Sequence, residues 1–400
     1  MLSVAEAENE VLAAVGLLPS EACPLSHAHG RVLRQPLRAD RDLPPFDRVT
    51  LDGYALRHDA WLEGRRRFLV AGVQAAGRSP LTLATGDACI EVMTGAVLPA
   101  GADTVVPFED TASAEGCMTV APTAKVVAGQ AVHRRGSDRT AGSEVVPAGV
   151  RLSGREIAVA AACGCAQLAV TVQPSIAVVA TGDELVDVGA PVAPHQIRRS
   201  NDHALRAALV TAGHPRVDRY HLQDQRHEIE HRLGHILAEY DVVLLTGGVS
   251  KGRYDLVPGV LAALGVQKLF QGVAQRPGGP FWFGLSPRRT PVFALPGNPA
   301  SSYICLHRYV LPALAKLSGL APGAPCRAVV TEPVARSPDL TRFLPVKITL
   351  GPRGEPLAAP APLNTSGDFA GLTGTDGFVE LPAGPGELAA GTAVPFWPWV

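Results

Sequence analysis

The spacing of apolar residues along the middle of the chain predicts an alternation of strands and helices. Three short apolar runs have the length and composition of buried strands, and they cover residues 176–180, 242–246 and 292–295. Between and after them, apolar residues recur every three or four positions, as they do along one face of an amphipathic helix. Strands that alternate with helices in this way predict a mainly parallel sheet that is covered on both faces.

Polar residues at the starts of the periodic segments predict where helices begin. Asn201 or Asp202 is expected to cap one helix, and Asp224 to cap the next. Near the N-terminus, Ser3 and Glu6 have the spacing of a capping box and are followed by an apolar stripe. The chain is therefore expected to open with an amphipathic helix.

The regions before and after the middle of the chain have a different sequence pattern. In them, short β-rich runs are separated by Gly and Pro, and no long helical period appears. Together with the middle of the chain, they predict a multidomain α/β plus all-β protein with a three-layer, parallel-rich α/β domain. The expected boundaries are a helical N-terminal and linker region at 1–45 and 148–174, a β-rich insert domain at 46–147, the α/β domain at 175–322, and a C-terminal β-barrel-like domain at 323–400.

Composition excludes several classes of protein. The chain has 400 residues, more than one hydrophobic core usually supports. Its 36 Lys and Arg balance 37 Asp and Glu, which argues against nucleic acid as a partner. Seven scattered cysteines do not have zinc-site spacing, and no apolar run is long enough to cross a membrane. We expect a soluble, cytoplasmic protein with no nucleic-acid or membrane partner.

The three predicted strands run into glycine-rich turns that carry hydroxyl and amide groups. In an open parallel sheet, ligands bind beyond the carboxyl ends of the strands, where all three turns lie. Any one such turn is more often a tight connection than a site. Three together, next to helix starts whose N–H groups favour phosphate, indicate a phosphate-type ligand. The candidate binding residues are Thr181, Gly182, Gly247, Gly248, Ser250, Pro296, Gly297 and Asn298.

Carboxylates lie at the same edge. Glu184 follows the first strand, and Asp255 follows the second glycine turn. Carboxylates beside a phosphate would repel it unless Mg²⁺ bridges the two, so the pattern favours a magnesium site. For Asp183, a cap on the chain leaving the strand is an equally good interpretation.

The β-rich domain supplies a second set of candidate residues. Asp52 precedes a Gly-Tyr turn, Thr94 begins a Thr-Gly-Ala turn, and Asp138 follows a basic run at 133–135. Taken singly, an aspartate in this setting is most often a turn former and a basic run a solvated face. Their combination with the α/β motifs, rather than any one of them, indicates a function.

In order along the chain, these motifs resemble the molybdopterin molybdenumtransferase family. The resemblance covers nearly the whole chain and is specific as a series, although the individual pieces are weak. The segments that carry it are LPPFDRVTLDGYA, MTGAVLPAGADTVV, GQAVHRRGSD, ATGDEL, TGGVSKGRYDLVP, RPGGPFWFG and ALPGNPASS.

The resemblance implies an elongated subunit of four parts that forms a homodimer, with the partner subunit's β-rich domain facing the molybdopterin-binding α/β domain. It implies that adenylylated molybdopterin and molybdate react in the presence of Mg²⁺ to give the molybdenum cofactor and AMP. A molybdopterin adenylyltransferase is the implied partner that supplies the substrate.

The resemblance also assigns residues. Asp255 is the expected metal ligand, directly or through water, and Glu184 and Asp224 are expected to orient the pterin or the adenylate. The implied catalytic residues are Asp52, Thr94, Asp138, Glu184, Asp224 and Asp255. Arg276 and Ser366 join the ligand-binding residues.

Some positions depart from the family pattern. Gly279 and Pro345 stand where the family usually has a Lys and an Arg, and Arg342 is a neighbouring cation that could compensate for Pro345. His133 stands where the family usually has a cation. Molybdate is a dianion, so each lost cation is expected to weaken its capture by about 1.5–3 kcal/mol.

Two alternatives remain beside the transferase itself. One is a molybdopterin-binding paralogue with reduced or altered oxyanion insertion. The other is an enzyme acting on a nucleotide, such as an adenylyltransferase or pyrophosphatase, for which the α/β domain alone would suffice. The sequence leaves the preference between molybdate and tungstate open.

Overall fold

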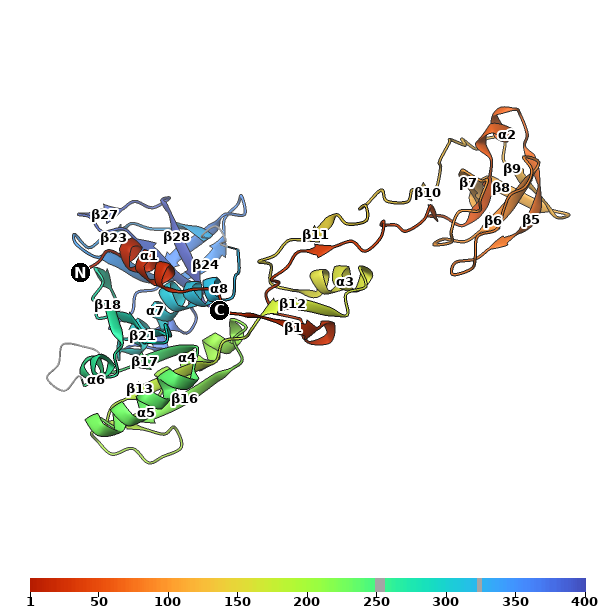
Figure 1. Ribbon diagram of the computed structural model, residues 1–400. Coiled ribbons are helices and arrows are strands. Elements are labelled where there is room, and N and C mark those ends of the chain that lie inside the picture. Colours follow the sequence, from red (N-terminus) through yellow and green to blue (C-terminus); the bar gives the residue numbers. More distant parts are fainter. Residues whose placement is uncertain (249–255, 322–325) are drawn as a thin grey trace.

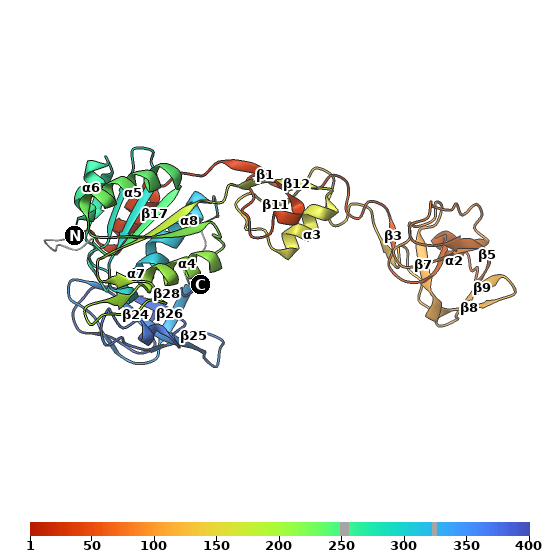
Figure 2. The ribbon, with the colours of Figure 1, turned by 90° about the horizontal axis from the view of Figure 1, so that it is seen from below.

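The computed structural model describes residues 1–248, 256–321 and 326–400. The molecule is elongated (Figures 1 and 2). A β-rich unit forms one end, a narrow waist follows, and an α/β unit and a C-terminal β unit lie side by side at the other end.

The α/β unit is built on a six-stranded sheet whose first four strands are parallel. The last two strands pair antiparallel at one edge. In spatial order the strands are β16 (Val217–Leu222), β13 (Ile176–Thr181), β17 (Val242–Thr246), β21 (Pro291–Leu295), β20 (Trp282–Leu285) and β18 (Gln267–Gln271). The predicted strands β13, β17 and β21 are confirmed. The sequence prediction missed β16, β18 and β20.

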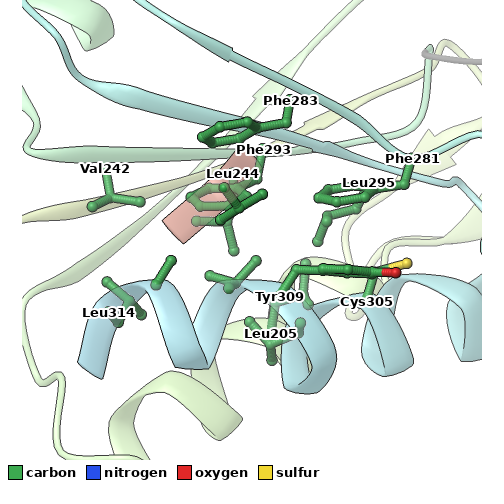
Figure 3. Close-up of a cluster of buried hydrophobic side chains, with 14 of the residues drawn as sticks. Leu205, Val242, Leu244, Phe281, Phe283, Phe293, Leu295, Cys305, Tyr309 and Leu314 are labelled. Carbon is green, nitrogen blue, oxygen red and sulfur yellow. The ribbon is translucent and has the colours of Figure 1, made fainter. Parts of the chain in front are cut away.

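Helices cover both faces of this sheet, as the apolar periods predict. Successive strand residues point to opposite faces, so Leu244 packs into one core and Leu245 into the other. Figure 3 shows the first core, where Leu244 and Phe293 of the sheet face Tyr309 and the neighbouring helix. That face carries α4 (Asn201–Thr211), α7 (Pro299–Cys305), the π-helical turn η3 (Leu306–Val310) and α8 (Leu311–Leu317); the other carries α5 (Arg226–Glu239) and α6 (Val257–Ala263).

The opening helix is confirmed, but two of the predicted caps are wrong. Helix α1 (Val4–Ala14) has the capping box of Ser3 and Glu6 and packs its buried face on the α/β unit. Asn201 and Asp202, in contrast, lie inside α4, and the residue before α5 is Gln225 rather than Asp224. The polar side chains at the start of α4 bind distant groups instead of their own helix.

The C-terminal β unit is a small closed sheet around its own core. Strand β24 (Thr341–Leu350) pairs with both β25 (Pro356–Pro360) and β26 (Gly377–Leu381), which closes the ring. The remaining strands are β22 (Cys326–Val330) and β28 (Ala393–Pro398), with the small pair β23 (Val334–Ala335) and β27 (Glu387–Leu388) and the turn η4 (Ala370–Leu372). The expected β-barrel-like ending is confirmed.

One short strand couples the two units. β19 (Gln275–Arg276) leaves the α/β unit and pairs in parallel with the start of β24, so that Arg276 lies beside Arg342. The buried Arg308 of η3 adds ion pairs to Glu8 of α1 and Glu380 of β26, at 2.8 and 2.9 Å. These contacts join the α/β unit and the barrel into one body.

The waist is formed by segments from both sides of the β-rich unit. β1 (Ser20–Pro24) pairs with β12 (Gln167–Thr171), and β2 (Leu37–Arg38) pairs with β11 (Glu144–Val146). The helix α3 (Gly154–Ala162) and the turn η1 (Leu25–His27) pack with them. Because α1 packs elsewhere, segment 1–45 is divided in space, and the domain boundaries stay a prediction.

The β-rich unit holds a six-stranded sheet with a hydrophobic cluster on each face. Its order is β7 (Thr104–Pro107), β4 (Gly53–Leu56), β6 (Ala88–Val92), β5 (Arg67–Gln74), β9 (Cys117–Val120) and β8 (Thr111–Ala114). Beside it lie α2 (His58–Leu62), η2 (Phe108–Asp110) and the pair β3 (Arg48–Val49) and β10 (Val132–His133). Among the helices of the described ranges, none has the length and hydropathy for crossing a membrane.

Candidate active site

A cavity of about 1080 Å³ opens where the carboxyl ends of β13, β17 and β21 face the C-terminal barrel. The three turns that follow these strands line it on the α/β side. Segments 336–338, 342–345 and 362–366 line it on the barrel side, and β19 and the loop after it lie between the two. Ligand sites in open α/β sheets occupy this edge, so the topology and the cavity agree.

The turn after β17 requires glycine at two successive positions. Gly247 and Gly248 have φ angles of +93° and +64°, in the left-handed region that favours glycine. A Cβ atom at Gly247 would lie 2.6 Å from the Thr181 carbonyl oxygen, and one at Gly248 would lie 2.8 Å from the Thr181 Oγ1 atom. The absence of side chains lets the turn approach the end of β13 and leaves backbone at the cavity wall.

Side-chain hydrogen bonds tie the turns after β17 and β21 to each other and to the barrel. The Asn201 Nδ2 group donates to Thr246 Oγ1 at 2.9 Å and to the Gly297 carbonyl at 2.8 Å. Asn298 donates to Ser366 Oγ at 2.7 Å, and the Ala300 N–H donates to the Ser366 carbonyl at 3.2 Å. Ser366 therefore fixes the barrel loop to the start of α7, at the cavity.

Several buried polar atoms on the cavity wall have no hydrogen-bond partner among the described residues. They are Thr181 Oγ1, Arg199 Nε, Asp202 Oδ1 and Arg336 Nε. Thr181 is 3% exposed and Asp202 is fully buried. Buried polar groups are almost always hydrogen-bonded, so their concentration at one cavity is the arrangement expected of a site that binds a polar ligand.

The cationic and carboxylate side chains on the cavity wall come from different elements. Glu184 and Asp224 come from loops of the α/β unit, whereas Arg276, Arg336 and Arg342 come from β19 and the barrel. Within the described part of the chain, these arginines form no ion pair with a carboxylate. Arg336 and Arg342 instead donate to the backbone carbonyls of Pro385 and Ala335, at 2.5 and 2.9 Å.

Arg276 and Arg342 are direct neighbours across two paired strands. Like charges opposite each other destabilise a sheet, and a bound anion would reverse the sign of this interaction. The arrangement is suited to an oxyanion. The sequence prediction had named Arg276 as ligand-binding and Arg342 as compensating, but it missed Arg336, Arg199 and Asn201, which only the tertiary structure brings here.

Most of the predicted binding residues share this one cavity. On its wall lie Thr181, Gly182, Glu184, Asp224, Gly247, Gly248, Arg276, Pro296, Gly297, Asn298 and Ser366. Asp183 is engaged locally, because its Oδ1 atom accepts a hydrogen bond from the Asp224 N–H at 2.9 Å. Gly279 and Pro345, the two uncharged departures, also line the cavity. Ser250 and Asp255 lie outside the described residues.

The other three predicted residues lie next to strands of the β-rich unit: Asp52 precedes β4, Thr94 follows β6 and Asp138 follows β10. Figure 1 shows this unit at the opposite end of the molecule from the α/β unit. Asp52 Oδ1 accepts hydrogen bonds from the Thr94 N–H at 2.6 Å and the Thr94 hydroxyl at 2.7 Å. Both hydrogen bonds lower the pKa of the Asp52 carboxyl below its ordinary value, and the bond from the Thr94 N–H has the larger effect. Asp138 pairs with His133 Nε2 at 3.0 Å. Within one chain, this group is separate from the cavity.

Three family profiles together match nearly the whole chain. Residues 2–164 match the MoeA N-terminal region, domains I and II. Residues 177–316 match a probable molybdopterin-binding domain, and residues 327–399 match the MoeA C-terminal region, domain IV. The cavity lies between the second and third of these regions.

Curated relatives and solved structures agree with the profiles. The molybdopterin molybdenumtransferase of Synechocystis sp. is 38% identical over 400 residues, which is the full length of both chains. That of Nostoc sp. is 35% identical and covers 81% of this chain and 76% of its own. Among solved structures, a molybdopterin biosynthesis MoeA protein from Pyrococcus horikoshii is 29% identical, with a TM-score of 0.83 over 100% of this chain and 99% of that one.

Proposed function

The chain belongs to the molybdopterin molybdenumtransferase family of molybdenum-cofactor biosynthesis, and we propose that its cavity binds adenylylated molybdopterin and molybdate, forms the cofactor and releases AMP. The observation that carries this proposal is the single cavity of about 1080 Å³ that joins three glycine-rich strand ends to three arginines without carboxylate partners in the described residues.

The α/β wall suits the phosphate end of the substrate. The Gly247–Gly248 backbone approaches the end of β13, and the buried Thr181 hydroxyl beside it lacks a partner among the described residues. Backbone N–H groups and a hydroxyl at such a turn are the donors that phosphoryl oxygens accept from. We therefore place the pyrophosphate of the adenylylated pterin along this wall.

The barrel wall suits molybdate. Arg276 and Arg342 lie side by side, and Arg336 and Ser366 line the same cavity. A tetrahedral dianion accepts charge-assisted hydrogen bonds from guanidinium groups and relieves their mutual repulsion. These residues replace the cations that the family pattern would place at Gly279 and Pro345.

The described carboxylates are compatible with Mg²⁺. Mg²⁺ is usually held by one or two carboxylates together with substrate phosphates, and Glu184 and Asp224 put two carboxylates on the cavity wall. When bound, the ion would neutralise charge on the phosphoryl oxygens as the phosphoanhydride breaks. Glu184 and Asp224 then have a second task, which is to orient the pterin or adenylate. Asp255, the metal ligand that the resemblance implies, remains a prediction.

A second copy of the chain completes the proposed site. Asp52, Thr94 and Asp138 are held by turns of the β-rich unit, away from the cavity of their own chain. The elongated shape supports our proposal that this unit contributes to the cavity of a partner in a two-fold homodimer. An adenylyltransferase is the proposed external partner, because the substrate has to be adenylylated first.

The direct test is turnover by the purified chain. With adenylylated molybdopterin, molybdate and Mg²⁺, AMP should appear on chromatography, and the product should activate a cofactor-free molybdenum enzyme. Omitting molybdate, or replacing Glu184 by Gln, should abolish cofactor formation. AMP release that does not depend on molybdate would instead identify a hydrolase of the adenylylated pterin.

A second candidate function is a molybdopterin-binding paralogue with reduced or altered oxyanion insertion. The specific observation in its favour is that Gly279 and Pro345 bring no charge to the cavity they line. This paralogue would bind the pterin without molybdate-dependent turnover. Gly279→Lys separates the two, because a large gain in activity would indicate a weakened enzyme, whereas no gain in an active protein would indicate that the arginines already compensate.

A further inference from the structure

Helix α5 carries three histidines at four-residue intervals. They are His227, His231 and His235, and all three are exposed. The opposite face of the helix buries Ile229, Leu233, Ile236 and Leu237 in the second core of the α/β unit. The histidines therefore form a stripe on the outer surface, where α5 lies at the edge of the molecule in both views (Figures 1 and 2).

Two of the three imidazoles are already in contact. The rings of His231 and His235 are 4.8 Å apart between centroids, with an interplanar angle of 72°. Residues four apart on a helix are neighbours on one face, so the backbone holds both rings on the same side of the helix. In the described part of the chain, His227 forms no such ring contact with His231.

The donor set decides which ions can bind. Neutral imidazole nitrogen is a ligand for Zn²⁺, Cu²⁺ and Ni²⁺, whereas Mg²⁺ prefers oxygen. Two histidines at positions i and i+4 of a helix can present nitrogens to one ion, as in the helical HExxH zinc motif. Among the described residues, three or more potential ligands do not gather at any point. A metal here would have two protein ligands and complete its shell with water.

We propose that His231 and His235 form a two-imidazole site for a divalent transition-metal ion, with Zn²⁺, Cu²⁺ and Ni²⁺ as the class. The ion cross-links two turns of α5 and so stabilises the helix that covers one face of the central sheet. The site is separate from the cavity and from the proposed Mg²⁺, so it stands whether or not the proposed reaction occurs.

The test is Ni²⁺ binding to the full-length chain without an affinity tag, measured by calorimetry in metal-free buffer. Loss of an outer-shell partner alone weakens metal sites by roughly 10–100-fold, so His231→Ala and His235→Ala should each weaken binding at least about tenfold. His227→Ala is the matched control on the same helix and should leave the affinity unchanged. Ni²⁺ should also raise the melting temperature of the wild type and of His227→Ala only.

Cu²⁺ gives a second readout that a stability change would not imitate. Electron paramagnetic resonance should report two nitrogen ligands in the wild type and fewer in His231→Ala or His235→Ala. Circular dichroism checks that the variants fold. Equal affinity in all four proteins, or an equal loss in His227→Ala, would overturn the proposal.

Discussion

Thr181 at the end of β13 lies against Gly248 in the turn after β17. The Thr181 hydroxyl is buried and has no partner among the described residues, and it lies where a side chain at Gly248 would have to go. A glycine is therefore needed at position 248 for two reasons. Its backbone is in the left-handed region, and a side chain would fill the space beside the Thr181 hydroxyl.

Gly248→Ala should weaken binding of molybdopterin, because the new methyl group meets Thr181 Oγ1 at 2.8 Å and Val257 Cγ2 at 2.9 Å. Strain in the left-handed region should also lower the free energy of unfolding by about 1–2 kcal/mol. Calorimetry with molybdopterin and chemical denaturation measure the two effects. Gly234→Ala in α5 is the control, since an alanine there should keep affinity and slightly raise stability.

Arg342 allows a separate test of the oxyanion wall. Arg342→Met removes one guanidinium but also removes the repulsion with Arg276. The KM for molybdate should rise by about tenfold or more, the value of one charge-assisted hydrogen bond, while stability stays within about 0.5 kcal/mol. Arg353→Met, in the exposed hairpin after β24, is the matched control. An unchanged KM would remove Arg342 from the proposed site.

At the scale of elements, the π-helical turn η3 anchors the end of the chain. His307 lies in this turn with Nδ1 2.9 Å from the Tyr303 carbonyl and Nε2 accepting the Val400 N–H at 3.3 Å. One ring nitrogen must donate and the other accept, which requires a neutral imidazole. Burial lowers the pKa of His307 to about 4, and burial likewise lowers the pKa of His214 to about 4.

Stability should therefore fall on mild acidification. Between the unfolded imidazole pKa of about 6.5 and the folded value, the unfolded chain binds protons that the folded chain does not, so the free energy of unfolding rises with pH in this window. Each histidine contributes at most about 3 kcal/mol between pH 6.5 and 4. His307→Leu should lower stability at neutral pH but roughly halve this dependence. Denaturation curves at several pH values measure the slope, and an unchanged slope would contradict the assignment.

Local signals in the sequence predict the parts of the site that lie on one element. The glycine turns after β13 and β17 follow from apolar strands that end in Gly residues, and the structure places both at the cavity. Asn201 could not be assigned in this way, because a cap and a long-range donor to Thr246 have the same local pattern. Arg336 is brought to the cavity by pairing of the barrel with β19, which no local period encodes.

At the scale of the whole molecule, the α/β unit and the barrel form one body, whereas the β-rich unit extends from a narrow waist. Among the described residues, one chain supplies both the α/β wall and the barrel wall of the cavity, and Asp52 and Thr94 are hydrogen-bonded to each other in the β-rich unit. Both groups are preformed before any second subunit is added. In the homodimer that we propose, the shared site would form when these two surfaces dock.

This arrangement predicts complementation between two inactive variants. Asp52→Asn inactivates the β-rich surface, and Glu184→Gln inactivates the cavity. In a mixed dimer, one site receives both substitutions and the other receives neither. Random exchange of subunits makes about half of the dimers mixed, so the mixture should recover about a quarter of wild-type activity.

Glu184→Gln mixed with Asp224→Asn is the control, because both residues line the cavity of one chain and every site keeps a defect. Recovery equal in the two mixtures, or absent from both, would mean that the site is not shared between subunits.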